Sequence, residues 1–260
     1  MKKGKTFLSA ALCAAALLAA AGAQFPDPDF SGASYQCRIF SRRNGDSGFI
    51  NLKFDGKHLM RGNRVYGVCR GAEKGEDITL SEQPRAEFKW ENNVLSNERF
   101  LIPRKARGDD AGKYAKICRR ITFGQDKITV EITVTALRDI TFPSIRRNIR
   151  EVIGIVTDSV RGMRIEGVRF DGQVISSLIP VRYERRKWSF TTYYRQLSMT
   201  GSEKLNMQVS AATGSKLYLN HYGGASIELE IYPEIRAADL RQKAGTETRI
   251  GYTIEFKKTE

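Results

Sequence analysis

The chain has 260 residues, of which 43 are Lys or Arg and 29 are Asp or Glu, so its formal charge at pH 7 is +14. A hydrophobic share of 41% beside 28% charged residues is typical of a folded domain and excludes a disordered chain. With two histidines and four cysteines, and with no phosphate loop, zinc-ligand spacing or nucleophile elbow, the sequence predicts no cofactor and no metal site.

The first 23 residues have the pattern of a signal peptide for export. Positive charge comes first, from Lys2, Lys3 and Lys5. An apolar run, Phe7 to Ala21, follows, and Ala21-Gly22-Ala23 then fits a cleavage site. The run is short and rich in alanine for a membrane span, although an uncleaved N-terminal anchor stays open. We expect cleavage after Ala23, a periplasmic or extracellular protein, and no transmembrane span after cleavage.

The rest of the chain alternates apolar and polar residues, as strands with one buried face do. The clearest strands are predicted at residues 128–134, 205–211, 227–231 and 250–256. Shorter strands are predicted at residues 50–54, 86–90, 152–156, 165–170 and 188–199. Turn-forming pairs separate them, such as Asp55-Gly56 and Asp171-Gly172.

Helical patterning is confined to Pro233–Ala244, which predicts one short helix or a turn. The fold class is therefore all-β: an antiparallel β-sandwich or supersandwich with ten or more strands. We expect residues 24–260 to form a single β-sandwich domain, with a long surface loop at residues 103–113.

Three cysteines remain after the signal segment: Cys37, Cys69 and Cys118. An oxidising compartment permits one disulfide, and Cys37 and Cys69 are the closest pair in the sequence. The alternative is that all three are small buried residues.

The positive charge is concentrated in two segments. Residues 99–120 contain eight Lys or Arg and two Asp, and residues 138–195 contain twelve Lys or Arg and six acids. Within the second, basic and aromatic residues interleave over residues 182–195, which we call the basic-aromatic segment. Its candidate ligand-binding residues are Arg182, Arg185, Arg186, Lys187, Trp188, Tyr193, Tyr194 and Arg195.

Such a segment suits an anionic polysaccharide or another envelope glycan, because arginines bind the anions and aromatic faces bind the sugar rings. A membrane surface is a second possible partner, and export makes nucleic acid an unexpected one. The alternative is structural: Trp188, Phe190 and Tyr194 point inward, and the basic residues form a solvated loop.

His221 is the leading candidate for a catalytic residue, with Tyr222 beside it. A histidine next to tyrosine, with an arginine near, suits proton abstraction beside a sugar carboxylate. His58, in a predicted hairpin, is a weaker candidate. Glu228 and Glu230 are expected on one strand face, about 7 Å apart, which suits paired carboxylates but is also common on a solvated face.

The end of the chain resembles galactose mutarotase-like β-supersandwich domains. The resemblance rests on Leu240–Phe256, where a short element, Ala244–Thr248 and an alternating terminal strand follow one another, and on the Asp-Gly hairpins. It implies a supersandwich fold and a carbohydrate ligand, since that family includes sugar epimerases and similar domains accompany polysaccharide lyases. Mutarotases pair catalytic histidines with a glutamate base, and that set does not map onto this sequence.

Three functions follow as hypotheses. The first is a secreted protein that binds carbohydrate, with an anionic polysaccharide as ligand. The second is a carbohydrate-active enzyme on the same scaffold, a polysaccharide lyase or sugar epimerase. The third is a non-catalytic structural or assembly protein of the cell envelope.

Overall fold

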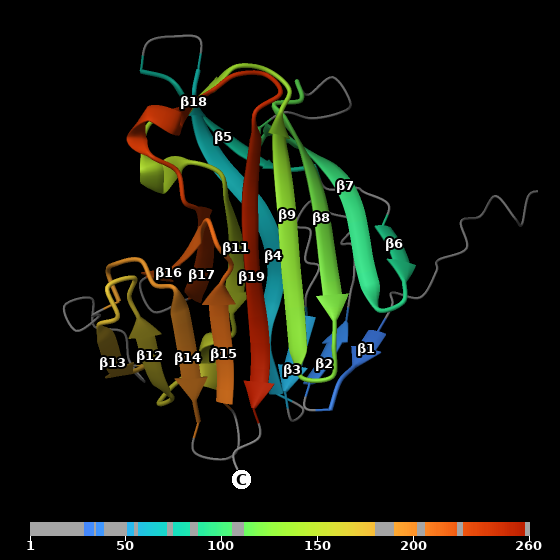
Figure 1. The fold of residues 1–260 in the computed structure, drawn as a ribbon, viewed down its shortest axis with the longest axis vertical. Coiled ribbons are helices and arrows are strands. Elements are labelled where there is room, and N and C mark those ends of the chain that lie inside the picture. Colours follow the sequence, from blue (N-terminus) through green and yellow to red (C-terminus); the bar gives the residue numbers. More distant parts are fainter. Residues whose placement is uncertain are drawn as a thin grey trace, which may run out of the picture.

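The computed structural model describes residues 29–33, 35–38, 51–54, 57–71, 75–83, 88–105, 112–179, 190–201, 206–222 and 226–257. Seventeen of the strands in these ranges join in one antiparallel hydrogen-bonded network, and two more pair separately (Figure 1). The fold is all-β and sandwich-like, as the alternating pattern predicts. Among the described residues, no helix has the length and apolar character needed to cross a membrane.

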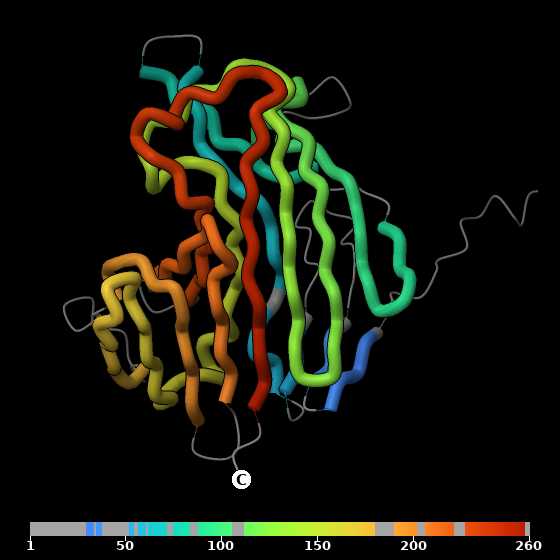
Figure 2. The backbone as a smooth tube through the Cα atoms, in the orientation of Figure 1, coloured from blue at the N-terminus to red at the C-terminus, as the bar shows by residue number. Residues whose placement is uncertain are grey.

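The network folds into two layers. The first layer, in spatial order, consists of β13 (Val174–Leu178), β12 (Arg164–Val168), β14 (Gln196–Thr200), β15 (Asn206–Ala211), β19 (Glu247–Lys257), β9 (Lys127–Ala136), β8 (Ala115–Phe123), β7 (Val94–Pro103) and β6 (Phe88–Glu91). Figure 2 shows the last strand, β19, running between β15 and β9 in the middle of this layer.

The second layer is built around the long strand β4. Its strands are β16 (Ser215–Tyr222), β17 (Ser226–Pro233), β11 (Arg150–Ile155), β4 (Lys57–Arg70), β3 (Asn51–Phe54), β2 (Tyr35–Arg38), β1 (Asp29–Ser31) and β5 (Asp77–Glu82). Strand β5 also pairs with β7, which joins the two layers along one edge. The short strands β10 (Ile140–Thr141) and β18 (Arg241–Gln242) pair with each other.

Alternate residues of both layers fill one continuous apolar core. Along β9 the buried side chains are Ile128, Val130, Ile132 and Val134, the set that the sequence assigns to the buried face. Strand β17 contributes Leu229 from the other layer. Each fully buried aliphatic side chain of this kind contributes about 1.5–3 kcal/mol, so the matched alternation fixes the layers face to face.

The local predictions are largely confirmed. The hairpin between β8 and β9 turns at Gly124, whose N–H donates to the Lys127 carbonyl at 2.7 Å. Gly172 adopts a φ of +87° in the turn between β12 and β13, where a side chain would be strained. The predicted helix is one 3-10 turn, η3 (Ala237–Leu240); η1 (Ile145–Arg147) and α2 (Thr157–Val160) are equally short.

The predicted strand at 188–199 is wrong in its described first half. Residues 190–195 are irregular, and β14 begins only at Gln196. Phe190 and Tyr194 are fully buried here, with ring centroids 5.4 Å apart. Both rings lie over Gly167, where a Cβ would come within 2.5 Å of Tyr194. The inward alternative for these two residues is therefore correct.

The structure does not contain the proposed Cys37–Cys69 disulfide. Neither cysteine is in a disulfide and both are buried, and Cys118, which is partly buried, is not in a disulfide either. The register explains why. Cys37 pairs with Leu52, and Leu52 pairs with Met60 on β4. Cys69 lies nine residues further along β4, about 30 Å by strand rise, whereas a disulfide needs Cα atoms within about 7 Å.

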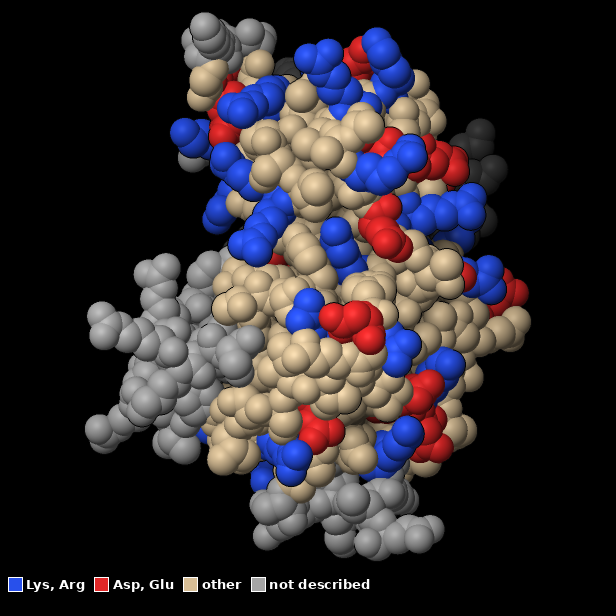
Figure 3. Space-filling model, turned by 60° about the vertical axis from the view of Figure 1, so that its left-hand side comes forward, with Lys and Arg blue, Asp and Glu red and all other residues tan. Residues whose placement is uncertain are grey.

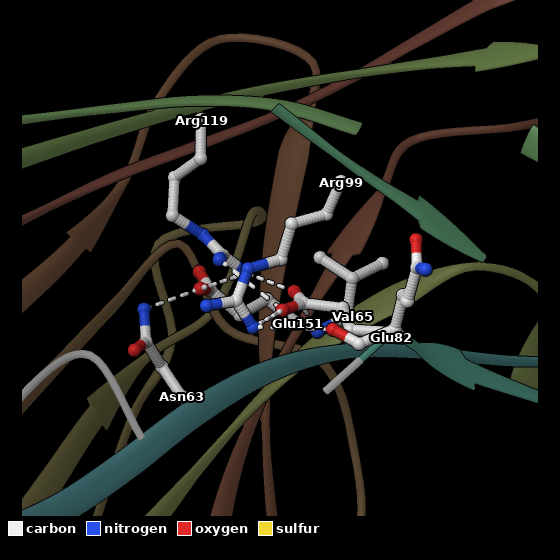
Figure 4. Close-up of polar contacts among 7 residues, drawn as sticks. Asn63, Val65, Glu82, Arg99, Arg119 and Glu151 are labelled. Carbon is white, nitrogen blue, oxygen red and sulfur yellow. Dashed lines mark hydrogen bonds and ion pairs between the residues drawn. The ribbon is translucent and has the colours of Figure 1, made fainter. Parts of the chain in front are cut away.

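Between the layers lies a cluster of buried charges (Figure 4). Arg99 of β7 and Arg119 of β8 point inward from the first layer, and Glu82 and Glu151 point inward from the second. Arg99 lies 3.3 Å from Glu82, and Arg119 contacts Glu82 closely and lies 3.4 Å from Glu151. Two guanidinium groups and two carboxylates make the cluster neutral.

Backbone and amide groups add contacts to the carboxylates. The Asn63 amide donates to Glu151 at 2.7 Å, and the Val65 N–H donates to Glu82 at 2.7 Å. Burial opposes the charge on Arg119, but Glu82 and Glu151 outweigh it and raise the pKa of its guanidinium. Removing one member would leave its partners charged in the core, which is far costlier than losing an exposed ion pair.

We expect Arg119→Met to lower the free energy of unfolding by about 3–5 kcal/mol, because Glu82 and Glu151 lose their shared cation. Denaturant unfolding measures this. The deficit should shrink as the pH falls, because burial raises the pKa of Glu151 and its protonation removes an uncompensated charge.

Arg120→Met is the matched control, since the adjacent Arg120 is exposed on the opposite face of β8. It should change stability by no more than about 0.5 kcal/mol. Equal losses in the two variants would contradict the structural role of the buried cluster.

Candidate functional site

The outer face of the second layer gathers polar and aromatic side chains from four neighbouring strands. Strand alternation turns Leu229 and Ile231 of β17 into the core and leaves Glu228, Glu230 and Tyr232 on the outside. The strand registers place residues of three neighbouring strands beside these three side chains. The aligned residues are Arg64 and Tyr66 of β4, Arg150 of β11, and Lys216, Tyr218 and Asn220 of β16.

We call this surface the tyrosine–arginine face, and count with it Arg146 and Tyr193, which pack over it. Tyr193 lies 5.6 Å from the Tyr218 ring and 5.5 Å from the Tyr232 ring. The Tyr232 hydroxyl is 3.2 Å from the Arg146 carbonyl oxygen. Segments far apart in the sequence thus meet on one surface.

Each cation of the face lies over a tyrosine ring. Arg150 is 5.0 Å from the Tyr66 centroid and 5.6 Å from that of Tyr232. The remaining pairs are Arg64 with Tyr66 at 5.9 Å, Arg146 with Tyr218 at 5.7 Å, and Lys216 with Tyr193 at 4.2 Å. Stacking of this kind holds long basic side chains in place without neutralising their charge.

The two glutamates of the face differ in their surroundings. Glu230 is 3% exposed and accepts hydrogen bonds from the Tyr232 hydroxyl and, at 3.4 Å, from the Asn220 amide. Arg150 lies 3.6 Å from it. Glu228 is only partly buried and makes no hydrogen bond or ion pair with any described residue. Glu230 is therefore held in place by its neighbours, while no described side chain holds the Glu228 carboxyl, which is available to contact a ligand.

Burial changes the acidity of several groups on the face. It raises the pKa of Glu228, an effect that Arg64 opposes and Glu230 strengthens. Burial also lowers the pKa of Lys216 and raises that of Tyr193. A carboxyl group with a raised pKa next to arginines is suited to proton transfer as well as to binding.

The basic-aromatic segment is only partly described. Arg182, Arg185, Arg186, Lys187 and Trp188 lie outside the described residues. Tyr193 belongs to the tyrosine–arginine face. Tyr194 does not act as a surface platform, because its ring is fully buried in the core. Arg195 is exposed, and its backbone pairs with Val168 and Ala211, in the other layer.

The structure describes the side chain of only one of the two predicted histidines. His221 and Tyr222 belong to β16 and pair in backbone register with Ile227 and Ser226, but their side chains lie outside the described part of the structure. His58 is exposed on β4, opposite Lys53. Among the described residues, no cluster of three His, Cys, Asp or Glu side chains is arranged to hold a metal ion.

Sequence reasoning found Glu228, Glu230 and Tyr193 but missed most of the face. The signal was present in part: the polar positions of β16 and β17 alternate with core residues over Lys216–Asn220 and Glu228–Tyr232. The contributions of β4 and β11 carry no such signal, because only the strand pairing brings Arg64, Tyr66 and Arg150 to this surface.

A hollow of about 990 Å³ lies over the outer face of the first layer. Its floor mixes charges of both signs, with Arg120 and Arg249 beside Glu98 and Glu131. Cys118 lies there too, 3.7 Å from the Glu98 carboxylate, and burial raises the pKa of its thiol. Because charges of both signs lie side by side and the raised pKa keeps the thiol protonated, this hollow is the weaker candidate for a site.

Comparison with known proteins gives no match by sequence. No family model matches the chain, and no curated protein matches it either.

Solved structures do resemble the fold. A putative aldose 1-epimerase from Escherichia coli K12 aligns with a TM-score of 0.55 over 90% of this chain and 99% of that one, at 10% identity. A galactose mutarotase-like protein from Lactobacillus casei aligns with a TM-score of 0.56 over 89% and 100%, at 9% identity. A protein from Synechocystis sp. PCC 6803 aligns with a TM-score of 0.53 over 91% and 99%, at 8% identity. The chain therefore has the galactose mutarotase-like β-sandwich fold over about nine-tenths of its length.

Proposed function

We propose that this protein binds a carbohydrate that carries negative charge, on the tyrosine–arginine face. The observation that supports the proposal is the convergence of four tyrosines, four cations and two carboxylates on one sheet surface. The partly exposed rings of Tyr66, Tyr193 and Tyr218 offer apolar surface to sugar rings, and carboxylates and amides accept and donate hydrogen bonds with hydroxyl groups. The fold, which is that of sugar-epimerase-like proteins, is consistent with a sugar ligand.

The balance of charge favours an anionic sugar over a neutral one. Arg64, Arg146, Arg150 and Lys216 outnumber Glu228 and Glu230, and Glu230 is already engaged by Arg150. Arginine forks bind carboxylate and sulfate groups with two parallel hydrogen bonds. A uronic acid or a sulfated sugar offers both the ring and the anion that such a surface accommodates.

Binding should be measured against neutral, uronic-acid-containing and sulfated polysaccharides at low and moderate salt. We expect Arg146→Gln and Tyr218→Ala each to weaken binding of the acidic polymers by about ten-fold or more, because each removes a contact of roughly 1.5 kcal/mol.

Arg164→Gln, an exposed arginine of the other layer, is the matched control and should bind normally. An Arg185→Ala/Arg186→Ala variant tests the basic-aromatic segment in the same assay. If only that variant lost binding, the ligand would belong to the segment and not to the face.

A second function is favoured by one observation, the partly buried Glu228 carboxyl with its raised pKa. On this hypothesis the protein is a lyase or epimerase that uses Glu228 as the group that takes or gives a proton. Glu228→Gln should then abolish turnover of a bound acidic sugar and keep its binding within a few-fold, while Glu228→Asp should restore part of the rate. His221→Ala separates the histidine hypothesis from this one, since it should leave turnover unchanged if Glu228 is the base.

We further propose that the protein is exported and that its signal segment is cleaved. The support is the order of charge, apolar run and small residues before Gln24. Intact-mass measurement of the protein recovered from the cell envelope or the medium should give a chain that begins at Gln24. Recovery of the full-length chain from the cytoplasm would contradict export.

A further inference from the structure

One end of the molecule gathers basic side chains from segments that lie far apart in the sequence. The ends of strands β4, β5, β7, β8, β9 and β18 meet there. The Arg104 N–H donates to the Thr79 carbonyl at 2.8 Å, and the Tyr114 N–H donates to the Leu101 carbonyl at 2.9 Å. Figure 3 shows Lys and Arg side chains gathered over this upper end.

We call this region the basic end and define it by its exposed cations: Arg70, Arg104, Lys105, Lys113, Arg138, Arg241 and Lys243. Few carboxylates oppose them. Asp77 pairs with Arg70 at 3.3 Å and with the neighbouring Arg147 at 2.7 Å, and Asp139 pairs with Lys243 at 3.1 Å.

The other five cations make no ion pair with any carboxylate among the described residues. They are Arg104, Lys105, Lys113, Arg138 and Arg241. Glu76 and Glu247 lie at the same end but pair with none of these five cations, so the described part of this end keeps an excess of positive charge. Its potential extends about one Debye length into the solvent, about 8 Å at physiological salt. This end therefore fits a surface of negative charge.

An apolar side chain protrudes among these charges. Leu137 is 45% exposed and sits next to Arg138, and its N–H is bonded to the Tyr114 carbonyl at 2.9 Å. A leucine held at the tip of a basic surface can enter the boundary between headgroups and acyl chains, while the cations stay among the phosphates.

Two aromatic rings at this end each lie against a cation. Lys113 lies 4.2 Å from the centroid of the Phe100 ring, and Arg138 lies 4.6 Å from that of Tyr114. Each of these two rings therefore has one face occupied by a cation. Cations alone would suit a soluble polyanion as well as phosphate headgroups, but a lipid surface also accommodates the exposed Leu137 side chain, so it fits this end better.

We propose that the basic end docks this protein onto a membrane surface rich in anionic phospholipids, with Leu137 inserted at the level of the headgroups. The basic end shares no residue with the tyrosine–arginine face. A protein docked in this way can hold a sugar ligand at the same time, and its membrane binding does not depend on whether the face binds sugar.

Co-sedimentation with vesicles of phosphatidylcholine, with and without phosphatidylglycerol, tests the proposal at low and physiological ionic strength. Each variant is purified with the N-terminus that the cell leaves after processing. Mass spectrometry checks that this N-terminus is the same in all of them. Each cation near an anionic membrane contributes about five-fold in partitioning. Arg104→Gln/Lys105→Gln/Arg138→Gln should therefore reduce binding to the anionic vesicles about 100-fold.

The matched control changes the same net charge at the opposite end of the first layer and of β4. Lys57→Gln/Lys127→Gln/Lys257→Gln should reduce binding to the anionic vesicles by less than ten-fold. All six substituted side chains are exposed, so thermal unfolding should be unchanged in both variants. Equal losses in the two triple variants would overturn the proposal, because binding would then follow net charge alone.

Leu137→Ser separates a bilayer from a soluble polyanion. It should weaken vesicle binding several-fold at physiological salt and leave binding to heparin or to an oligonucleotide unchanged. A protein that binds heparin or the oligonucleotide through the basic end, but does not sediment with anionic vesicles, would overturn the lipid proposal. Binding to phosphatidylcholine alone, unaffected by the triple substitution, would also overturn it.

Discussion

The buried charges between the two layers constrain the rest of the sandwich. Arg119 can be charged in the core only if Glu82 and Glu151 reach it from the opposite layer, so strands β5, β8 and β11 must keep one mutual arrangement. A slip of one residue along β8 would exchange Arg119 for Arg120 and turn the neighbouring apolar side chains to solvent. The cluster thus adds an electrostatic condition to the register that apolar burial already favours.

The candidate site follows from the same alternation, seen from the other side of the sheet. Because β17 and β16 bury their apolar residues in the core, their polar residues must lie on the outer face. Residues 190–195 and the segment around Arg146 then pack over that face through Tyr193 and the Arg146 carbonyl. Burial of Glu228 within this face raises the pKa of its carboxyl. The site is therefore a product of sheet packing and not of a local motif.

The basic residues of the chain lie in three different physical environments. Arg99 and Arg119 are neutralised in the core, whereas Arg150 stacks on tyrosines beside Glu230. Arg104 and Arg138 remain exposed and unmatched at the basic end. Three of these residues, Arg99, Arg104 and Arg119, come from the same basic segment of the sequence, so charge density along the chain does not indicate which arginines meet a ligand.

The sequence by itself determined the all-β class, the strands with strict alternation and the Gly-containing turns, because these depend on residues that are neighbours in the chain. It did not reveal β7 or the first part of β8 as strands, since Arg99 and Arg119 interrupt their apolar faces. It also did not exclude the Cys37–Cys69 disulfide, which depends on register across three strands. Only the tertiary structure decided that Tyr194 is buried and that Glu228 and Glu230 lie beside arginines of β4 and β11. The placement of the two glutamates depends on pairing between residues more than 70 positions apart, where the sequence carries no local periodicity to reveal it.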